Sequence, residues 1–152
     1  MNKKVAQLWI KALRSGKYKQ GQNVLLDEKN RYCCLGVLCD LYNKDCRSHK
    51  KRELTVRKSV EPDSNLEDDL HSFSFGGQTF RLPAAVKRWA GMRSDTGTME
   101  CPKGVLSKGE KWDEDVIRTD PTLAELNDGL WDSKKRSFDK IATIIEKNVD
   151  LL

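Results

Sequence analysis

Four cysteines and a histidine lie close together in the first third of the chain, and they are its first candidates for chemistry. Thiolates and an imidazole are the usual ligands of a structural zinc ion, and the residues concerned are Cys33, Cys34, Cys39, Cys46 and His49. A structural zinc site usually contains a C-x-x-C knuckle, whereas Cys33 and Cys34 are adjacent and point opposite ways in an extended chain. We therefore expect reduced thiols packed in the core and no bound metal.

Cys34 is also the candidate nucleophile, because a helix is expected to begin there and a helix N-terminus lowers the pKa of a thiol. A cysteine nucleophile needs a base, and the histidines His49 and His71 lie in polar segments without a partner that would orient them. Gly76-Gly77 lies between two expected strands and does not resemble a phosphate-binding loop. The sequence leaves the question of an enzyme open, but it favours a protein without catalytic residues and without a cofactor.

Two acidic runs, Glu67-Asp68-Asp69 and Asp113-Glu114-Asp115, contain the carboxylates that a divalent cation or a nuclease would need. Their spacing gives no reason for carboxylates from different elements to converge. We interpret both runs as solvated acidic loops.

Charge is distributed unevenly along the chain, whose net charge is +5. Residues 1–60 contain 15 Lys and Arg against 5 Asp and Glu, whereas residues 71–152 contain 13 of each. A basic N-terminal half favours an anionic partner such as a nucleic acid, a nucleotide or an acidic protein surface. Neither basic patch is interleaved with aromatic residues, and a charge run is usually a solvated face. Nucleic-acid binding would use Lys50-Lys51-Arg52 with Arg57-Lys58, and Lys134-Lys135-Arg136.

A further group of polar residues would suit a small nucleotide. Tyr18 and Gln20 lie in an expected loop beside Lys17, and Asn127-Asp128 end an expected helix. An aromatic ring, an amide and a cation are what a small anionic nucleotide requires. Taken singly, Tyr18 would also suit the edge of the core, and Asn127-Asp128 would suit a helix cap. The candidate ligand contacts are Lys17, Tyr18, Gln20, Arg31, Asn127 and Asp128.

These residues have to be positioned around the apolar run from Tyr32 to Tyr42, which carries one charge in eleven residues. A segment this apolar must be buried, and we predict a helix over about 34–43 against which the other elements pack. Gly36 lies inside that helix, where a glycine costs about 1 kcal/mol relative to alanine. We therefore expect the backbone of another segment to approach Gly36 closely.

Apolar residues at helical spacing predict a first helix over about 3–15 and a last helix that begins after Ser137. Between them, Pro83 fits the first turn of a third helix, and Asp120-Pro121 fits the start of a short fourth one. Residues 92–119 lack a clear period, and we interpret them as a long ordered loop.

Two β-hairpins are expected. Residues 24–26 and 31–33 flank a turn-prone stretch, and the segments on either side of Gly76-Gly77 alternate apolar with polar residues. In the second hairpin Phe73 would lie opposite Phe80. The core face of that hairpin would be Phe73, Phe75, Phe80 and Leu82. Between the hairpins, residues 44–70 are interpreted as a polar insertion, either a solvated loop or a loop with a short strand over 54–56.

Length and composition bound the remaining questions. The chain has 152 residues, which suits one domain with its own core. No run approaches the roughly 20 apolar residues that a membrane span needs, and the first residues lead into an amphipathic pattern rather than a signal peptide. We expect a cytoplasmic protein without membrane contact, whose cysteines stay reduced. The sequence leaves the formation of a homo-oligomer open.

Several motifs resemble a group of short proteins encoded by bacteriophage genomes. The resemblance is carried by W-x-x-A-L-R-S-G-K-Y-K-Q-G from Trp9 to Gly21, Y-C-C-L-G-V-L-C-D from Tyr32 to Asp40, and L-A-E-L-N-D from Leu123 to Asp128. It implies expression inside an infected bacterium from an accessory gene, and it brings no catalytic residue set. Small phage accessory proteins commonly act by stoichiometric binding that disarms host defences.

Together these observations predict a single α+β domain over residues 1–152, with a small antiparallel sheet built from two hairpins and packed with four to five helices. For the function we expect a non-enzymatic phage accessory protein in the cytoplasm of the infected host. It would counter host defence by sequestering a small nucleotide signal or by blocking a host protein. The alternative is a nucleic-acid-binding protein that uses the basic patches.

Overall fold

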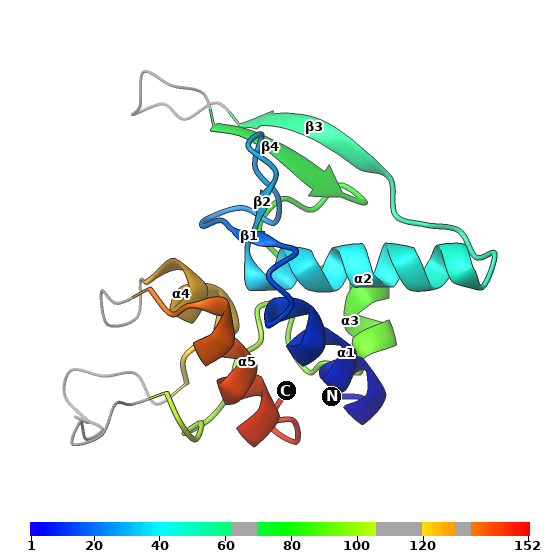
Figure 1. Ribbon diagram of the computed structural model, residues 1–152. Coiled ribbons are helices and arrows are strands. Elements are labelled where there is room, and N and C mark those ends of the chain that lie inside the picture. Colours follow the sequence, from blue (N-terminus) through cyan, green and yellow to red (C-terminus); the bar gives the residue numbers. More distant parts are fainter. Residues whose placement is uncertain (62–69, 106–119, 130–134) are drawn as a thin grey trace.

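The computed structural model describes residues 1–61, 70–105, 120–129 and 135–152 (Figure 1). These residues form a single compact α+β domain, which confirms the predicted fold class. The helices are α1 (Lys3–Leu13), α2 (Cys34–Ser48), α3 (Ala84–Ala90), α4 (Leu123–Asp128) and α5 (Phe138–Lys147). The strands are β1 (Lys19–Gln20), β2 (Arg31–Tyr32), β3 (Val56–Glu61) and β4 (Leu70–Phe75).

The predicted apolar run forms the centre of the molecule. Its helix, α2, crosses the middle of Figure 1, with the strands on one side and the other helices on the other side. Leu35, Val37 and Leu38 are fully buried, and the indole Nε1 of Trp9 donates to the backbone oxygen of Cys34 at 2.9 Å. The apolar run is therefore interior, as predicted, and α1 is fixed to its first turn.

The helices α1 and α5 pack side by side beneath α2 (Figure 1). α1 buries Trp9 and Leu13, whereas Leu8, an apolar residue of the same helix, remains 51% exposed. α5 begins after Ser137, as predicted, because the Ser137 hydroxyl accepts a hydrogen bond from the Lys140 backbone nitrogen at 3.3 Å. These two helices close the core on the side away from the strands.

The strands form two small sheets that single bridges connect. β3 and β4 are antiparallel, whereas β1 and β2 are parallel. Leu26 forms an antiparallel bridge with Tyr32, and Asp27 forms another with Ser72 in β4. The neighbouring order is therefore β3, β4, residues 26–27, β2 and β1. The expected pairing of 24–26 with 31–33 is confirmed as a turn with one bridge, and the parallel strand β1 was not predicted.

The prediction for Gly76-Gly77 is right about the turn and wrong about the partner strand. Phe75 and Gln78 exchange backbone hydrogen bonds of 2.9 and 3.1 Å across the two glycines, both of which have positive φ. The chain then leaves the ladder, and β4 pairs with β3, so Phe73 does not lie opposite Phe80. Phe80 is 47% exposed instead of buried. The other members of the predicted core face are buried or packed against the core: Phe73, Phe75 and Leu82.

α2 is longer than predicted, because its buried side continues beyond residue 43. Asn43 and Cys46 still face the interior while the intervening residues meet solvent. The described part of the expected insertion 44–70 therefore contains the end of a helix and the strand β3, which begins at Val56 rather than at residue 54. Residues 62–69, with the acidic run Glu67-Asp68-Asp69, lie outside the described residues.

The close approach predicted at Gly36 is confirmed. A Cβ atom at this position would lie 1.7 Å from the backbone oxygen of Leu25. The same oxygen accepts a hydrogen bond from the Cys33 backbone nitrogen at 3.3 Å. Glycine at position 36 thus lets the segment before β2 rest directly on the first turn of α2.

The remaining boundaries agree with the sequence except at α4. α3 follows Pro83 and ends at Gly91, whose φ is 63°. α4 begins later than predicted, because its N-cap is Thr122 in a capping box with Glu125 rather than Asp120. Of the predicted loop 92–119, residues 106–119 lie outside the described residues, and so does the acidic run Asp113-Glu114-Asp115.

Candidate functional site

The cysteines of α2 are structural in this arrangement. Cys33 is the N-cap of the helix, and its Sγ accepts from the Gly36 backbone nitrogen at 3.4 Å. The Sγ of Cys34 donates to the backbone oxygen of Leu123 at 3.4 Å. Burial raises the pKa of Cys33 to about 12 and raises the pKa values of Cys34 and Cys39 well above the ordinary thiol value. These thiols are therefore held protonated, unlike a catalytic thiolate.

The cysteines and the histidine considered as metal ligands do not come together. Within the described part of the chain, no group of three or more His, Cys, Asp and Glu side chains is arranged to hold an ion. His49 is exposed at the end of α2, with its Nδ1 3.4 Å from the Asp45 carboxylate. Cys33, Cys34 and Cys39 point into the core instead.

Two of the predicted ligand contacts, Gln20 and Asn127, hydrogen-bond to each other inside the protein. The Gln20 Nε2 donates to Asn127 Oδ1 at 3.0 Å and to the Arg136 backbone oxygen at 2.8 Å. The Gln20 Oε1 accepts from the Phe138 backbone nitrogen at 3.1 Å. Gln20 therefore ties β1 to the start of α5.

Asn127 is completely buried, and each end of its amide has two partners. Its Oδ1 accepts from Gln20 and from the Cys34 backbone nitrogen at 3.2 Å. Its Nδ2 donates to the Gly21 backbone oxygen at 2.9 Å and to Asp128 Oδ1 at 2.8 Å. One amide thus joins β1, the start of α2 and the end of α4, and none of its hydrogen-bonding capacity is left for a ligand.

Asp128 lies at the rim of the same network. Its Oδ1 accepts from the Asn23 backbone nitrogen at 3.0 Å, and its backbone oxygen accepts from Gln22 Nε2 at 2.8 Å. Burial raises the pKa of Asp128, although the hydrogen bonds from Asn127 and Asn23 act in the other direction. This carboxylate fixes the loop that follows β1.

Tyr18 belongs to a different cluster, which we call the tyrosine cluster: Tyr18, Tyr32, Asp40 and Lys44. The Tyr18 hydroxyl donates to Asp40 Oδ2 at 2.6 Å and accepts from Lys44 Nζ at 2.9 Å. The Lys44 ammonium also lies 2.8 Å from Asp40 Oδ2 and 5.1 Å from the centre of the Tyr18 ring. Tyr32 packs edge-on against Tyr18, with ring centroids 5.3 Å apart. The cluster therefore combines two rings, a carboxylate and a cation.

The electrostatics of the tyrosine cluster follow from partial burial. Desolvation, and then the hydrogen bond to Asp40, raises the pKa of Tyr18. The hydrogen bond to Asp40, followed by that to Tyr18, raises the pKa of Lys44. At neutral pH the phenol is therefore neutral and the ammonium charged, with more than half of the Lys44 side chain in solvent.

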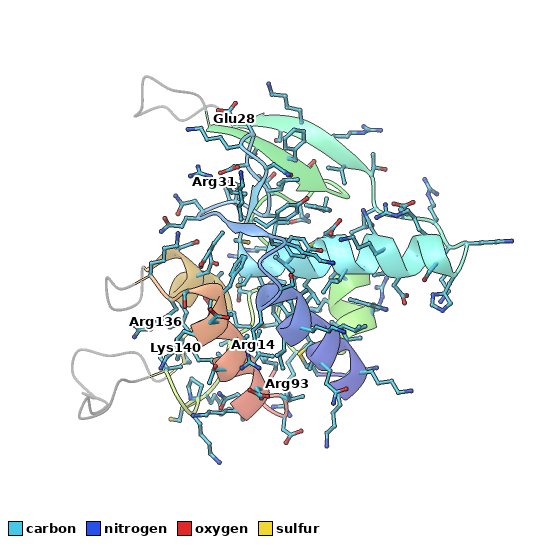
Figure 2. All side chains as sticks on the ribbon, viewed as in Figure 1. Arg14, Glu28, Arg31, Arg93, Arg136 and Lys140 are labelled. Atoms are coloured by element: carbon cyan, nitrogen blue, oxygen red, sulfur yellow. The ribbon has the colours of Figure 1, made fainter. Side chains whose placement is uncertain are left out.

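Further cations lie near Tyr18 in the sequence. Lys17 and Lys19 flank Tyr18 and are exposed, and Lys19 in β1 pairs with Arg31 in β2 in the parallel register. The Arg31 Nε lies 2.6 Å from Asp27 Oδ2, so its charge is partly neutralised. Figure 2 labels Arg31 beside the ribbon of β1 and β2, at a distance along the molecule from the basic residues of α1 and α5.

The two basic patches differ in exposure. Lys50, Lys51, Arg52, Arg57 and Lys58 are all exposed where the chain passes from α2 into β3. In the other patch, Lys134 lies outside the described residues and Arg136 is only 8% exposed. The Arg136 guanidinium instead donates to the backbone oxygen of Val105 at 3.4 Å.

A shallow groove lies elsewhere on the surface. It has a volume of about 330 Å³ and lies between α1 and α5. None of its lining residues belongs to the tyrosine cluster or to the predicted ligand contacts. They are Lys3, Ala6, Gln7, Ile10, Glu146, Lys147, Val149 and Asp150.

The structure thus divides the predicted ligand contacts into two groups. Lys17, Tyr18 and Arg31 form none of the described hydrogen bonds of the internal network, which contains Gln20 and Asn127 with Asp128 at its rim. Sequence reasoning missed Tyr32, Asp40 and Lys44, because the first two belong to a run judged apolar. The i, i+4 spacing of Asp40 and Lys44 is the signal that indicates a shared helix face.

Comparisons with known proteins place the chain in a family without assigning it an activity. In the described residues no helix is both long and apolar enough to span a bilayer. No curated protein and no solved structure matches the chain. A family model described as "Domain of unknown function (DUF8296)" matches residues 1–149. Since this match covers nearly the whole chain, the protein belongs to that family of unknown function.

Proposed function

We propose that the protein is a phage accessory protein that binds a small nucleotide at the tyrosine cluster without transforming it, and so removes a signal of host defence. The observation that carries the proposal is the tyrosine cluster itself, in which two half-buried rings adjoin the exposed ammonium of Lys44. Aromatic faces stack on nucleobases, and cations attract phosphate. The phage setting comes from the sequence motifs.

Charge supports an anionic ligand at this face. Lys17 and Lys19 flank Tyr18 in the sequence, Lys44 contacts its hydroxyl and ring, and all three lysine side chains are exposed. Positive charges gathered on one face raise the association rate of an anion, and the effect weakens as salt is added. The buried, protonated thiols of α2 support binding rather than nucleophilic catalysis.

A thermal-shift panel followed by calorimetry tests the proposal. Cyclic mononucleotides, cyclic dinucleotides and ADP-ribose are the probes, and at least one is expected to raise the melting temperature and to bind with a stoichiometry near one. Tyr18→Ala and Lys44→Ala should each weaken that binding about tenfold, the loss of one stacking or charged contact. Lys11→Ala, an exposed lysine of α1, is the matched control and should bind as the parent does. No shift with any probe would discard the nucleotide proposal.

Blocking of a host protein by the same face is the other form of this proposal. A pull-down from infected cells, with the parent protein and with the Tyr18→Ala variant as baits, separates the two forms. Small molecules identified in the bound fraction of the parent alone support nucleotide binding. A host protein lost specifically with Tyr18→Ala supports the blocking form.

Nucleic-acid binding is the second candidate, and the exposed basic residues between α2 and β3 favour it. Binding through phosphates would make the affinity fall steeply with salt. Filter binding of duplex DNA and RNA over a salt series measures that slope. Replacing Lys50 and Lys51 by alanine should reduce the slope by about two, whereas Lys11→Ala should leave it unchanged. An affinity that does not change with salt contradicts this candidate.

A further inference from the structure

The two carboxylate oxygens of Asp40 have different surroundings. Both described donors, the Tyr18 hydroxyl and the Lys44 ammonium, lie on Oδ2. No described residue donates to Oδ1, and the Asp40 side chain is only 21% exposed. Among the described residues, Oδ1 is not one of the fully buried polar atoms that lack a partner, so it reaches the surface, where it keeps acceptor capacity that a ligand can satisfy.

The contacts made by Oδ2 of Asp40 also fix the direction in which Oδ1 points. Tyr18 is positioned by its edge-on contact with Tyr32, and Lys44 follows Asp40 by one helical turn. With Oδ2 held from two sides, the plane of the carboxylate cannot turn freely. Oδ1 is therefore a preoriented acceptor beside two aromatic rings, and little entropy is lost when a donor binds to it.

We propose that Asp40 selects nucleotides whose base carries an exocyclic amine, which donates to Oδ1 while the base stacks on the tyrosine cluster. This inference rests on the proposed nucleotide binding and adds the identity of the base edge. Adenine and cytosine present an amine where hypoxanthine and uracil present a carbonyl oxygen. If the base keeps the same position, a carbonyl in place of the amine would face the Asp40 carboxylate with no proton between the two acceptors, and such an unpaired polar contact disfavours binding.

Two matched ligand pairs test the inference by calorimetry on the full chain. AMP is compared with IMP, and CMP with UMP, because in each pair the exocyclic amine is replaced by a carbonyl while the neighbouring ring nitrogen gains a proton. The parent protein should bind the amine member of each pair at least tenfold more tightly, which is the effect of one charge-assisted hydrogen bond.

The variant Asp40→Asn gives the sharper readout. Its amide oxygen can accept from Tyr18 and Lys44, so the amide nitrogen then occupies the place of Oδ1 and donates. The preference should therefore disappear or reverse toward IMP and UMP. Asp45→Asn, on the same helix and outside the cluster, is the matched control and should keep the preference of the parent. Circular dichroism of each variant checks the fold.

The outcomes distinguish the proposed role of Asp40 from the proposed binding of a nucleotide. If the parent binds both members of each pair equally, or if Asp40→Asn keeps the amine preference, the role of Asp40 is overturned while nucleotide binding stands. If none of the four nucleotides binds, the role of Asp40 is overturned, while nucleotide binding stands or falls with the thermal-shift panel of cyclic nucleotides and ADP-ribose. An amine preference that depends on Asp40 supports the inference.

Discussion

At the scale of single residues, Asn127 shows how a polar side chain can be essential without touching a ligand. Its amide is fully buried and has four partners, from β1, α2 and α4. A buried polar group left without its partners costs about 1–3 kcal/mol. The arrangement therefore makes Asn127 a fixed point between segments that are far apart in the sequence.

Replacing Asn127 by alanine should lower the free energy of unfolding by about 3 kcal/mol, because four buried partners lose their hydrogen bonds together. Urea denaturation followed by circular dichroism measures the change. Gln22→Ala is the control, since the exposed Gln22 side chain contacts only the rim of the network and its loss should cost less than about 0.5 kcal/mol. Equal stability of the two variants would contradict the role given to Asn127.

The cysteines give a second residue-scale prediction. All five lie in the described part of the chain, and among them only Cys101 is exposed. With Ellman's reagent, the native protein should show one fast thiol, because the other four thiols are buried and burial also raises the pKa values of Cys33, Cys34 and Cys39. Five thiols should react in denaturant. Cys101→Ser should remove the fast phase, and a fast phase that persists in this variant would mean that α2 exposes a thiol.

The residue scale is also where the sequence was least informative. The sequence around a glutamine or asparagine does not reveal whether its amide faces solvent or a buried carbonyl. In the structure, the amides of Gln20 and Asn127 bind partners inside the protein. Cys34 was correctly interpreted as a packed thiol, because no base or metal-ligand spacing accompanied it. The role of Asp40 could not be predicted, because a single charged residue in an apolar run does not indicate which hydrogen-bond partners it has.

At the scale of elements, Gly36 holds the contact on which the β1/β2 ribbon rests. Gly36→Ala should lower the free energy of unfolding by at least about 2 kcal/mol, because the new methyl group would overlap the Leu25 carbonyl oxygen and force a backbone shift. Chemical denaturation of the variant measures this cost.

Gly16→Ala provides the comparison for Gly36. Gly16 has a φ of 69° with no atom near a built Cβ, so alanine there should cost only the backbone strain of about 1 kcal/mol. A cost at position 36 no greater than that at position 16 would show that the segment before β2 can move away from α2.

Helices were predicted better than strand partners, for a physical reason. A helix is specified by its own periodicity, so α1, α3 and α5 were found from local sequence alone. A strand needs a partner, and alternation around Gly76-Gly77 identified the turn without revealing that Thr79 would bond to Leu25 instead. β3 follows a polar stretch whose composition favours a loop, and only its pairing with β4 makes it a strand.

At the scale of the molecule, one hydrophobic cluster contains residues from every helix and from β4. Domains with a single core usually unfold in one step. We therefore expect thermal unfolding curves from far-ultraviolet circular dichroism and from tryptophan fluorescence to coincide, because Trp9 lies in the same core that holds the helices together. Separate midpoints for the two signals would show that the loss of helical structure and the exposure of the core do not occur in one step.

The packing of α1 on α5 has a consequence for the way the protein is made (Figure 1). A ribosome adds about 5–20 residues per second, so α1 leaves the tunnel well before its partner helix has been translated. During this interval the side of α1 that packs on α5 has no native surface to cover it. Nascent chains that stall before residue 138 would leave this side of α1 exposed to solvent, and we expect chaperones to bind them.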